Sequence, residues 1–74
     1  MARDICVALG ERIRQLRTVR GWRQIDLAEE TGIHENYVSE LELGRKEVCL
    51  RTLETLARAF EMSAAELLKG IQGQ

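Results

Sequence analysis

The sequence predicts an all-α fold, a bundle of five short helices. Apolar residues recur three or four positions apart along almost the whole chain, which is the spacing of helices that each bury one face. Proline is absent, and glycines follow the apolar stripes at points where helices are expected to stop. A chain of 74 residues can build one small core, so we expect residues 1–74 to form a single domain.

The first helix is predicted from Ile5 to Arg20. Arginines occupy most of its polar positions and are expected to lie in solvent. Gly21 ends the helix, and we expect the following Trp22 to anchor over the core. The apolar residues follow one another at spacings of four, four, three and three positions and form a single stripe: Ile5, Leu9, Ile13, Leu16 and Val19.

Two shorter helices, over residues 24–31 and 34–43, are joined by a turn at Gly32. A glycine adopts the left-handed backbone conformation of such a turn at little cost. Gly44 stops the second of the two helices. The residues of this pair that we expect in the core are Leu27, Ala28, Val38 and Leu41.

The last third of the chain predicts a loop over residues 45–49 and two further helices. An apolar stripe runs through the fourth helix from Leu50 to Phe60. Ser63 and Glu66 have the spacing of a capping box, which opens the fifth helix. The apolar residues at this end of the chain are Leu67, Leu68 and Ile71. A core of this size leaves a net stability of about 3–5 kcal/mol, so association of two copies would help.

The formal net charge of −1 is the sum of three unlike segments. Residues 1–23 contain six arginines and two acids, which gives them a net charge of +4. Residues 24–44 contain six acids and no Lys or Arg, a net charge of −6, and residues 45–74 have a net charge of +1. A weak overall charge therefore does not by itself exclude a nucleic-acid partner, although such partners usually require a basic surface.

The cysteines and the single histidine predict no metal site, no cofactor and no enzyme. Cys6 and Cys49 lie 43 positions apart, and His34 is the only histidine, so four zinc ligands at the usual spacings are missing. His34 with one cysteine is a remote alternative as a catalytic pair. No apolar run reaches the roughly 20 residues of a membrane span, and the N-terminus lacks the apolar core of a secretory signal. We therefore expect a cytoplasmic protein without membrane contact.

Residues 24–43 have the spacing of a helix-turn-helix, in which two short helices meet at a glycine turn. The pattern consists of Asp26-Leu27-Ala28, Gly32, Val38-Ser39, Leu41-Glu42 and Gly44. With it, residues 9–69 resemble the phage-repressor and Cro-like (Xre-type) family, whose fold is lambda-repressor-like. Within that family, the chain is most similar to restriction-modification controller proteins, on the segments Gly32-Ile33-His34, Tyr37-Val38-Ser39 and Glu42-Leu43-Gly44-Arg45.

The resemblance implies that the third helix enters the major groove of DNA and presents its first residues to base edges. An asparagine bonds adenine through two hydrogen bonds, a serine can contact several bases, and a carboxylate can accept a hydrogen bond from cytosine N4. The alternative for the two glutamates is a solvated helix surface. The candidate base-reading residues are Glu35, Asn36, Ser39 and Glu40.

The resemblance also implies contacts with the DNA backbone. Gln24 matches a glutamine that touches a phosphate or a neighbouring side chain, and Arg45 and Lys46 match a loop that grips the backbone. Arg23 stands where the family has a serine or threonine that caps the second helix. We expect the helix to lack this cap and the arginine to place a positive charge near a DNA phosphate. His34 and Tyr37 are further candidates. Each has an alternative, since His34 can cap the third helix and Tyr37 can pack on the fourth.

Two other roles follow from the resemblance. Glu42 is expected to form a structural ion pair with Arg17 of the first helix. The fifth helix and its flank are expected to supply the dimer interface, through Leu67, Leu68 and Ile71. Ile25 and Leu43 stand at positions that are usually polar, and we expect them to add exposed apolar surface.

These features together predict a sequence-specific DNA-binding transcriptional regulator. It would act as a homodimer on a palindromic operator whose half-sites are about 34 Å apart. The partner is double-stranded DNA, and no small-molecule effector is expected. The acidic helix pair, residues 24–44, lies between the basic first helix and the cations Arg45 and Lys46. This charge distribution predicts a protein that binds DNA weakly and depends on the correct base sequence. The alternative is a protein-interaction or antitoxin-like module on the same scaffold, which the acidic segment favours.

Overall fold

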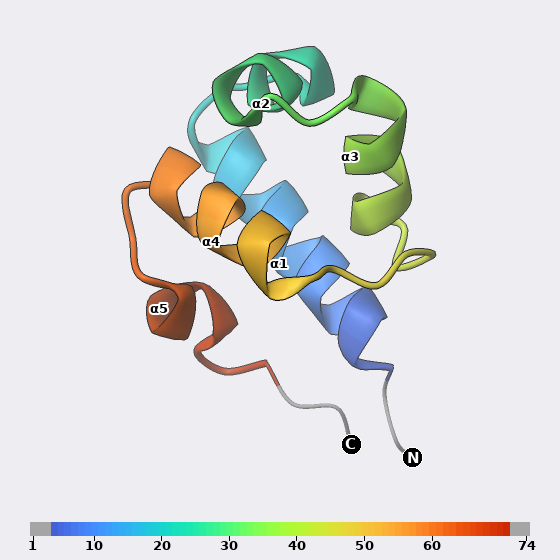
Figure 1. Ribbon diagram of the computed structural model, residues 1–74, viewed down its shortest axis with the longest axis vertical. Helices are drawn as coiled ribbons and strands as arrows, with labels where there is room; N and C mark the ends of the chain where they lie inside the picture. The colour runs from blue at the N-terminus through green and yellow to red at the C-terminus, as the bar shows by residue number, and fades with distance from the viewer. Residues whose placement is uncertain (1–3, 72–74) are drawn as a thin grey trace.

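The computed structural model of the protein describes residues 4–71 and contains five α-helices in that range (Figure 1). They are α1 (Ile5–Val19), α2 (Gln24–Thr31), α3 (Glu35–Glu42), α4 (Leu50–Ala59) and α5 (Ala64–Leu68). The predicted all-α, five-helix fold is confirmed, and the helix ends differ from the predicted ones by one or two residues. None of the described helices has the length and apolar character needed to cross a membrane.

The helices pack against one another in a small bundle. Contacts join α1 to α3, α2 to both α3 and α4, and α4 to α5. In Figure 1, α3 and α5 lie on opposite sides of the molecule, with α1 and α4 between them. The buried apolar residues form one cluster: Leu9, Ile13, Leu27, Ala28, Val38, Leu41, Leu53, Leu56, Ala57, Phe60 and Leu67. All of them lie in the predicted helices, so the helical spacing located the core.

The predicted stripes are wrong at their ends. Ile5, Val19 and Leu50 are exposed, although each continues the apolar period of its helix. Each of these residues lies at the first or last position of its helix. Periodicity identifies the face of a helix that is buried, but it does not show how far along the axis the neighbouring helices extend.

Gly10 marks the point where α1 and α3 are closest. A Cβ atom built on Gly10 would overlap the carbonyl oxygen of Leu41 and lie 2.7 Å from that of Glu42. Only a residue without a side chain lets the two backbones approach this closely. Ala28 is buried as predicted, but the close approach of the two backbones lies at Gly10.

Arg12 and Arg17 of α1, and Arg20 directly after it, make structural contacts. The expectation that the arginines of this helix lie in solvent is wrong for Arg12 and Arg20, whereas Arg17 was expected to pair with Glu42. Arg12 donates to the carbonyl oxygens of Leu67 and Glu66, at 3.2 and 3.1 Å. Arg20 donates to the carbonyl oxygen of Phe60 at 2.7 Å, and its guanidinium lies 4.9 Å from the centre of the Phe60 ring. The third, Arg17, belongs to the network described below.

Trp22 anchors over the core as predicted. Its ring stacks on that of Phe60, with 6.0 Å between the ring centres, and the guanidinium of Arg20 lies over both rings. Cation–π contacts of this kind add to the stacking. The loop between α1 and α2 is thereby held against the end of α4.

The α4–α5 turn contains a left-handed residue that is not glycine. Glu61 has φ of 59°, and the amide of Met62 donates to the carbonyl oxygen of Ala57 at 2.9 Å, as in a Schellman helix end. A side chain with a Cβ atom is disfavoured in this conformation by roughly 1–2 kcal/mol. The predicted capping box then follows, with Ser63 Oγ accepting from the amide of Glu66 at 3.0 Å.

Replacing Glu61 with glycine is therefore expected to stabilise the protein. The gain should be about 0.5–1 kcal/mol, because relief of the left-handed strain exceeds the entropy that glycine adds to the unfolded chain. Urea unfolding monitored by Trp22 fluorescence would measure it. Glu61→Ala is the matched control, since it removes the same carboxylate but keeps the Cβ atom. Equal stabilities of the two variants would show that the left-handed backbone of Glu61 is not strained.

Candidate nucleic-acid interface

The N-terminal half of α3 presents the expected polar face. Glu35 and Asn36 are exposed, and Ser39 and Glu40, one helical turn further on, are half-buried. The opposite face of α3 is turned into the core. The four candidate base-reading residues therefore share one surface of the helix.

His34 caps α3. Its Nδ1 accepts a hydrogen bond from the amide of Asn36 at 3.1 Å. In the neutral ring, the other nitrogen then carries the proton and remains exposed as a donor. The capping alternative is present in the structure, and it leaves a donor at the start of the helix.

A buried ion pair joins α1 to the end of α3. Arg17 donates through Nε and Nη2 to the two carboxylate oxygens of Glu42, at 2.6 and 2.9 Å. The side chains are only 12% and 4% exposed. Hydrogen bonding to Glu42 raises the pKa of Arg17. This is the pair that the resemblance implied, and its geometry is that of a two-pronged arginine–carboxylate bond.

Two further groups complete this network. Gln24, the first residue of α2, donates from Nε2 to Glu42 at 3.1 Å, and Arg17 also donates to the carbonyl oxygen of Trp22 at 2.8 Å. Gln24 thus meets a neighbouring side chain, one of the two contacts expected for it. The network fixes the start of α2 relative to the end of α3, and so fixes the helix-turn-helix as a unit.

Arg23 precedes α2 without a side-chain cap, as expected from its chemistry. Asp26 compensates, since its carboxylate accepts from the amide of Arg23 at 2.7 Å and from the guanidinium at 3.1 and 3.2 Å. These hydrogen bonds lower the pKa of Asp26. The Arg23 side chain remains 78% exposed, so the cation is held at the rim of the helix pair.

The loop after α3 carries Arg45 and Lys46, and both side chains are exposed. Arg45 lies 3.4 Å from the carboxylate of Glu40. Tyr37 packs against the core, and its hydroxyl donates to the carbonyl oxygen of Glu47 at 3.0 Å. The tyrosine therefore connects the helix to this loop as well as to the core, which includes residues of α4.

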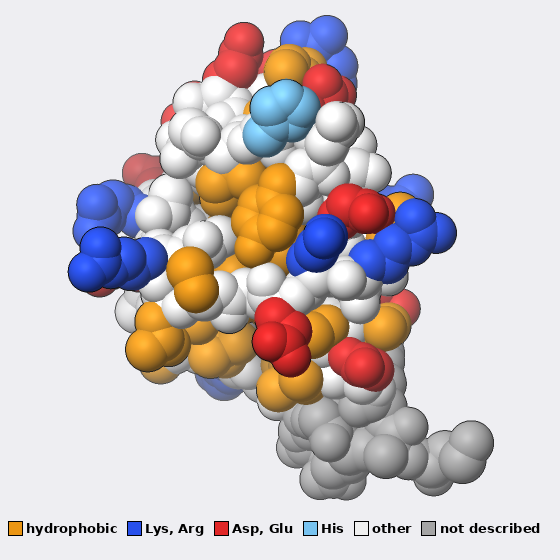
Figure 2. Space-filling model, turned by 45° about the vertical axis from the view of Figure 1, so that its right-hand side comes forward, with side chains coloured by type: hydrophobic (Ala, Val, Ile, Leu, Met, Phe, Trp, Pro, Cys, Tyr) orange, Lys and Arg blue, Asp and Glu red, His pale blue; other side chains and the backbone are white. Residues whose placement is uncertain are grey.

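The acidic segment is partly neutralised by neighbouring cations. Of its six acids, three form ion pairs: Asp26, Glu40 and Glu42. Figure 2 shows the face that includes α3, with acidic and basic side chains side by side next to a hydrophobic patch. The net charge of the segment could not show this, because the partners of all three acids, Arg17, Arg23 and Arg45, come from outside residues 24–44.

The residues expected at a dimer interface divide into two groups. Leu67 is fully buried, so it belongs to the core rather than to the surface expected for it. Leu68 is exposed and Ile71 is half-buried. Leu43 is exposed as expected, but Ile25 packs against the core and adds little surface.

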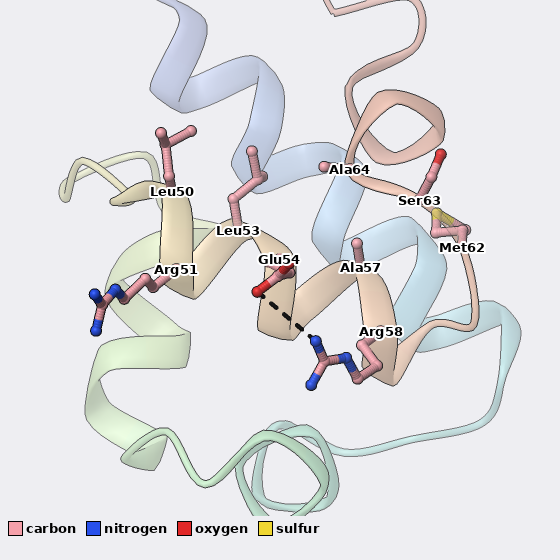
Figure 3. A pocket seen from close by; sticks show the side chains of 9 residues that line it. All are labelled: Leu50, Arg51, Leu53, Glu54, Ala57, Arg58, Met62, Ser63 and Ala64. Atoms are coloured by element: carbon pink, nitrogen blue, oxygen red, sulfur yellow. Dashed lines mark ion pairs between the residues drawn. The ribbon is translucent and has the colours of Figure 1, made fainter.

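The apolar groove along α4 was not predicted, although exposed apolar residues were expected on α5. A shallow groove of about 580 Å³ runs along α4 to the start of α5, and its lining includes Leu50, which is 84% exposed (Figure 3). Glu54 and Arg58 form an ion pair at its edge, 3.7 Å apart. A smaller pocket of about 280 Å³ includes Leu68 and shares Leu53 with the groove. Leu50 is the residue that could have indicated this groove, but its spacing places it in the apolar stripe of the fourth helix.

Within residues 4–71, no three His, Cys, Asp or Glu side chains gather in a way that could hold a metal ion. Cys6 is half-buried and Cys49 is exposed. The sulfur of Cys49 lies 3.2 Å from the hydroxyl of Thr52 at the start of α4. The two cysteines therefore take no part in the candidate interface, whereas His34 caps α3.

Comparison with known proteins identifies the same helix-turn-helix fold. Residues 8–69 match the family described as "Helix-turn-helix domain". The chain is 41% identical over 64 residues to the HTH-type transcriptional regulator DdrOP3 of Deinococcus deserti, covering 86% of this chain and 50% of that protein. It is 37% identical over 65 residues to the control protein C.SmaI of Serratia marcescens, covering 88% and 77%.

A solved structure agrees with these relatives. The restriction-modification controller protein C.AhdI from Aeromonas hydrophila superposes with a TM-score of 0.80 at 37% identity, over 84% of this chain and 94% of that one. The chain spans half the length of DdrOP3 but most of both controller proteins. The resemblance to phage-repressor-like regulators and to controller proteins is confirmed, and the chain belongs to the helix-turn-helix domain family.

Proposed function

We propose that this chain is a sequence-specific DNA-binding transcriptional regulator that acts in the cytoplasm as a homodimer on a palindromic operator. The observation that carries the proposal is the exposed polar face of α3, held in place by the network of Arg17, Gln24 and Glu42. The relatives are named as transcriptional regulators and control proteins, and this agrees with the expectation that the chain is not an enzyme.

The chemistry of the exposed face suggests which bases it reads. Asn36 can bond adenine through two hydrogen bonds, and Glu35 can accept from cytosine N4. Ser39 is half-buried one turn further on and can reach only a base close to the helix. An acidic residue at this surface repels phosphate, so Glu35 favours binding only where a cytosine is correctly placed.

The cations lie on both sides of this face. Arg23 stands before α2, and Arg45 and Lys46 follow α3, with all three side chains exposed. Gln24 and the exposed ring nitrogen of His34 lie at the starts of the two helices, where they can donate hydrogen bonds to phosphate oxygens. These groups supply the attraction that the acidic face lacks.

The dimer surface is expected on the side of the molecule away from α3. Half-sites about 34 Å apart put each recognition helix about 17 Å from the two-fold axis. The molecule is 23 Å across in each of its two shorter directions, so a contact surface on the side away from α3 fits this spacing. Helix α5, which carries Leu68, lies opposite α3 in Figure 1, and the groove runs from α4 to the start of α5.

The rival function, a protein-interaction or antitoxin-like module, loses part of its support. It rested on the net charge of −6 in residues 24–44, and half of those acids are engaged in ion pairs with arginines. Selection of bound duplexes from a random-sequence library separates the two functions. A regulator selects a palindrome, whereas a protein-binding module selects no sequence.

The salt dependence of DNA binding tests the backbone contacts. Arg45→Ala and Lys46→Ala should each reduce the log–log slope of affinity against salt by about 0.9, because each removes one neutralised phosphate. Fluorescence anisotropy with a duplex selected by the wild type would measure the slopes. Lys69→Ala at the end of α5 is the control and should leave the slope unchanged. A wild-type affinity that does not vary with salt would contradict the proposed function.

A further inference from the structure

The loop that follows α3, residues 44–49, is connected to α3 at three points. It carries Arg45 and Lys46, the two cations proposed to meet the DNA backbone. Loops with exposed charged side chains are usually mobile. The connections described below restrict this one.

The first connection is the backbone at the end of α3. The amide of Gly44 donates to the carbonyl oxygen of Leu41, and the amide of Arg45 donates to that of Glu40, both at 3.0 Å. This is a Schellman helix end, with Gly44 in the left-handed conformation at φ of 74°. A Cβ atom on Gly44 would lie 2.7 Å from Cα of Val7, so the loop is also pressed against α1.

The second connection is the side chain of Glu40. Its carboxylate lies 3.4 Å from a guanidinium nitrogen of Arg45, whose side chain is 67% exposed. A solvent-exposed pair of this kind contributes little to folding. It does, however, limit the directions that the long arginine side chain takes, and it draws the guanidinium toward the polar face of α3.

The third connection is the hydroxyl of Tyr37. The ring packs against the core, so the hydroxyl is held at a fixed place, and it donates to the carbonyl oxygen of Glu47 at 3.0 Å. Glu47 lies directly after Lys46. The two cations are therefore bracketed, by Glu40 on one side and by the tyrosine hydroxyl on the other.

We infer that Tyr37 and Glu40 are positioning residues, which hold the 44–49 loop against α3 and thereby set where Arg45 and Lys46 meet the DNA backbone. This inference rests on the proposed function. It replaces the expectation that Glu40 reads a base and that Tyr37 touches a phosphate. Both residues act through the loop cations, so neither determines the base sequence that is bound.

The first test needs no DNA. Tyr37→Phe keeps the buried ring and removes only the hydroxyl, so amide hydrogen exchange in the full chain should become about threefold faster at residues 45–48, the effect of losing one neutral hydrogen bond. Exchange in α1 and α4 should not change. Unchanged exchange at residues 45–48 would overturn the inference, even if the wild type binds no duplex and the proposed function fails.

The second test compares two variants that remove the same charge from the helix pair. Glu30→Gln in α2 and Glu40→Gln in α3 each remove one exposed or half-buried acid, but only Glu40→Gln releases Arg45. On the duplex selected by the wild type, Glu40→Gln should bind about threefold more weakly than Glu30→Gln when Arg45 is present. The difference should disappear when both are combined with Arg45→Ala.

Base preference decides between positioning and reading. Tyr37→Phe and Glu40→Gln should weaken binding by the same factor on every single-base variant of the selected duplex. A changed preference at one base pair, or an effect of either variant that persists in the Arg45→Ala, Lys46→Ala background, would overturn the inference.

Discussion

Alanine in place of Gly10 is expected to remove most of the free energy of unfolding of this protein. In an isolated helix, the same change stabilises by about 0.5–1 kcal/mol. Here the new Cβ atom overlaps the carbonyl oxygens of Leu41 and Glu42, so α1 and α3 must separate. Overpacking of this kind costs roughly 1–3 kcal/mol and more where backbone must move, which is most of the stability of so small a core.

Circular dichroism and urea unfolding would measure the loss at Gly10. Arg14→Ala is the control, because Arg14 lies on the same helix with an exposed side chain and should change stability by less than about 0.5 kcal/mol. A Gly10→Ala variant as stable as the wild type would show that the two helices can move apart freely.

Glu42→Ala is expected to destabilise the protein by about 3–5 kcal/mol. The change leaves Arg17 charged and nearly buried without its carboxylate, and it removes the acceptor of Gln24. The variant should therefore unfold rather than merely bind DNA more weakly. Thermal unfolding followed by circular dichroism would measure this effect.

The double variant Arg17→Met, Glu42→Leu separates a pairing effect from a packing effect. Replacing both charges by apolar groups of similar size removes the unpaired charge, so most of the lost stability should return. Gln24→Ala tests the third member alone and should cost about 1.5–3 kcal/mol, as for one hydrogen bond to a charged group. A double variant no more stable than Glu42→Ala would mean that the pair itself is not the cause.

The fold could be predicted from the sequence because each helix carries a strong apolar stripe and ends at a recognisable residue. Gly32 and Gly44 both have the left-handed conformation that helix ends require. The crossing at Gly10 was not predicted, although a glycine inside a helical stripe is a known sign of close backbone approach. The α4–α5 turn also escaped prediction, because Glu61 gives no sign of a left-handed residue.

The candidate site was predictable only in part. The resemblance placed the polar face on α3 and implied the pair of Arg17 and Glu42. Long arginine side chains could not be assigned, because their ends reach residues far away in sequence, as Arg12 does with Leu67. The contact between Tyr37 and Glu47 likewise depends on the path of a loop, which no periodic pattern describes.

Glu42 connects three helices, and this has a consequence for the concentration of folded, active protein. Glu42 belongs to α3, Arg17 to α1 and Gln24 to α2, so unfolding any one helix removes a partner from this buried charged network. The helix that carries the reading surface cannot melt while the rest stays intact. Folding and readiness to bind are therefore one all-or-none event. Heat or a destabilising mutation would reduce the number of competent molecules, and each remaining molecule would keep its full selectivity.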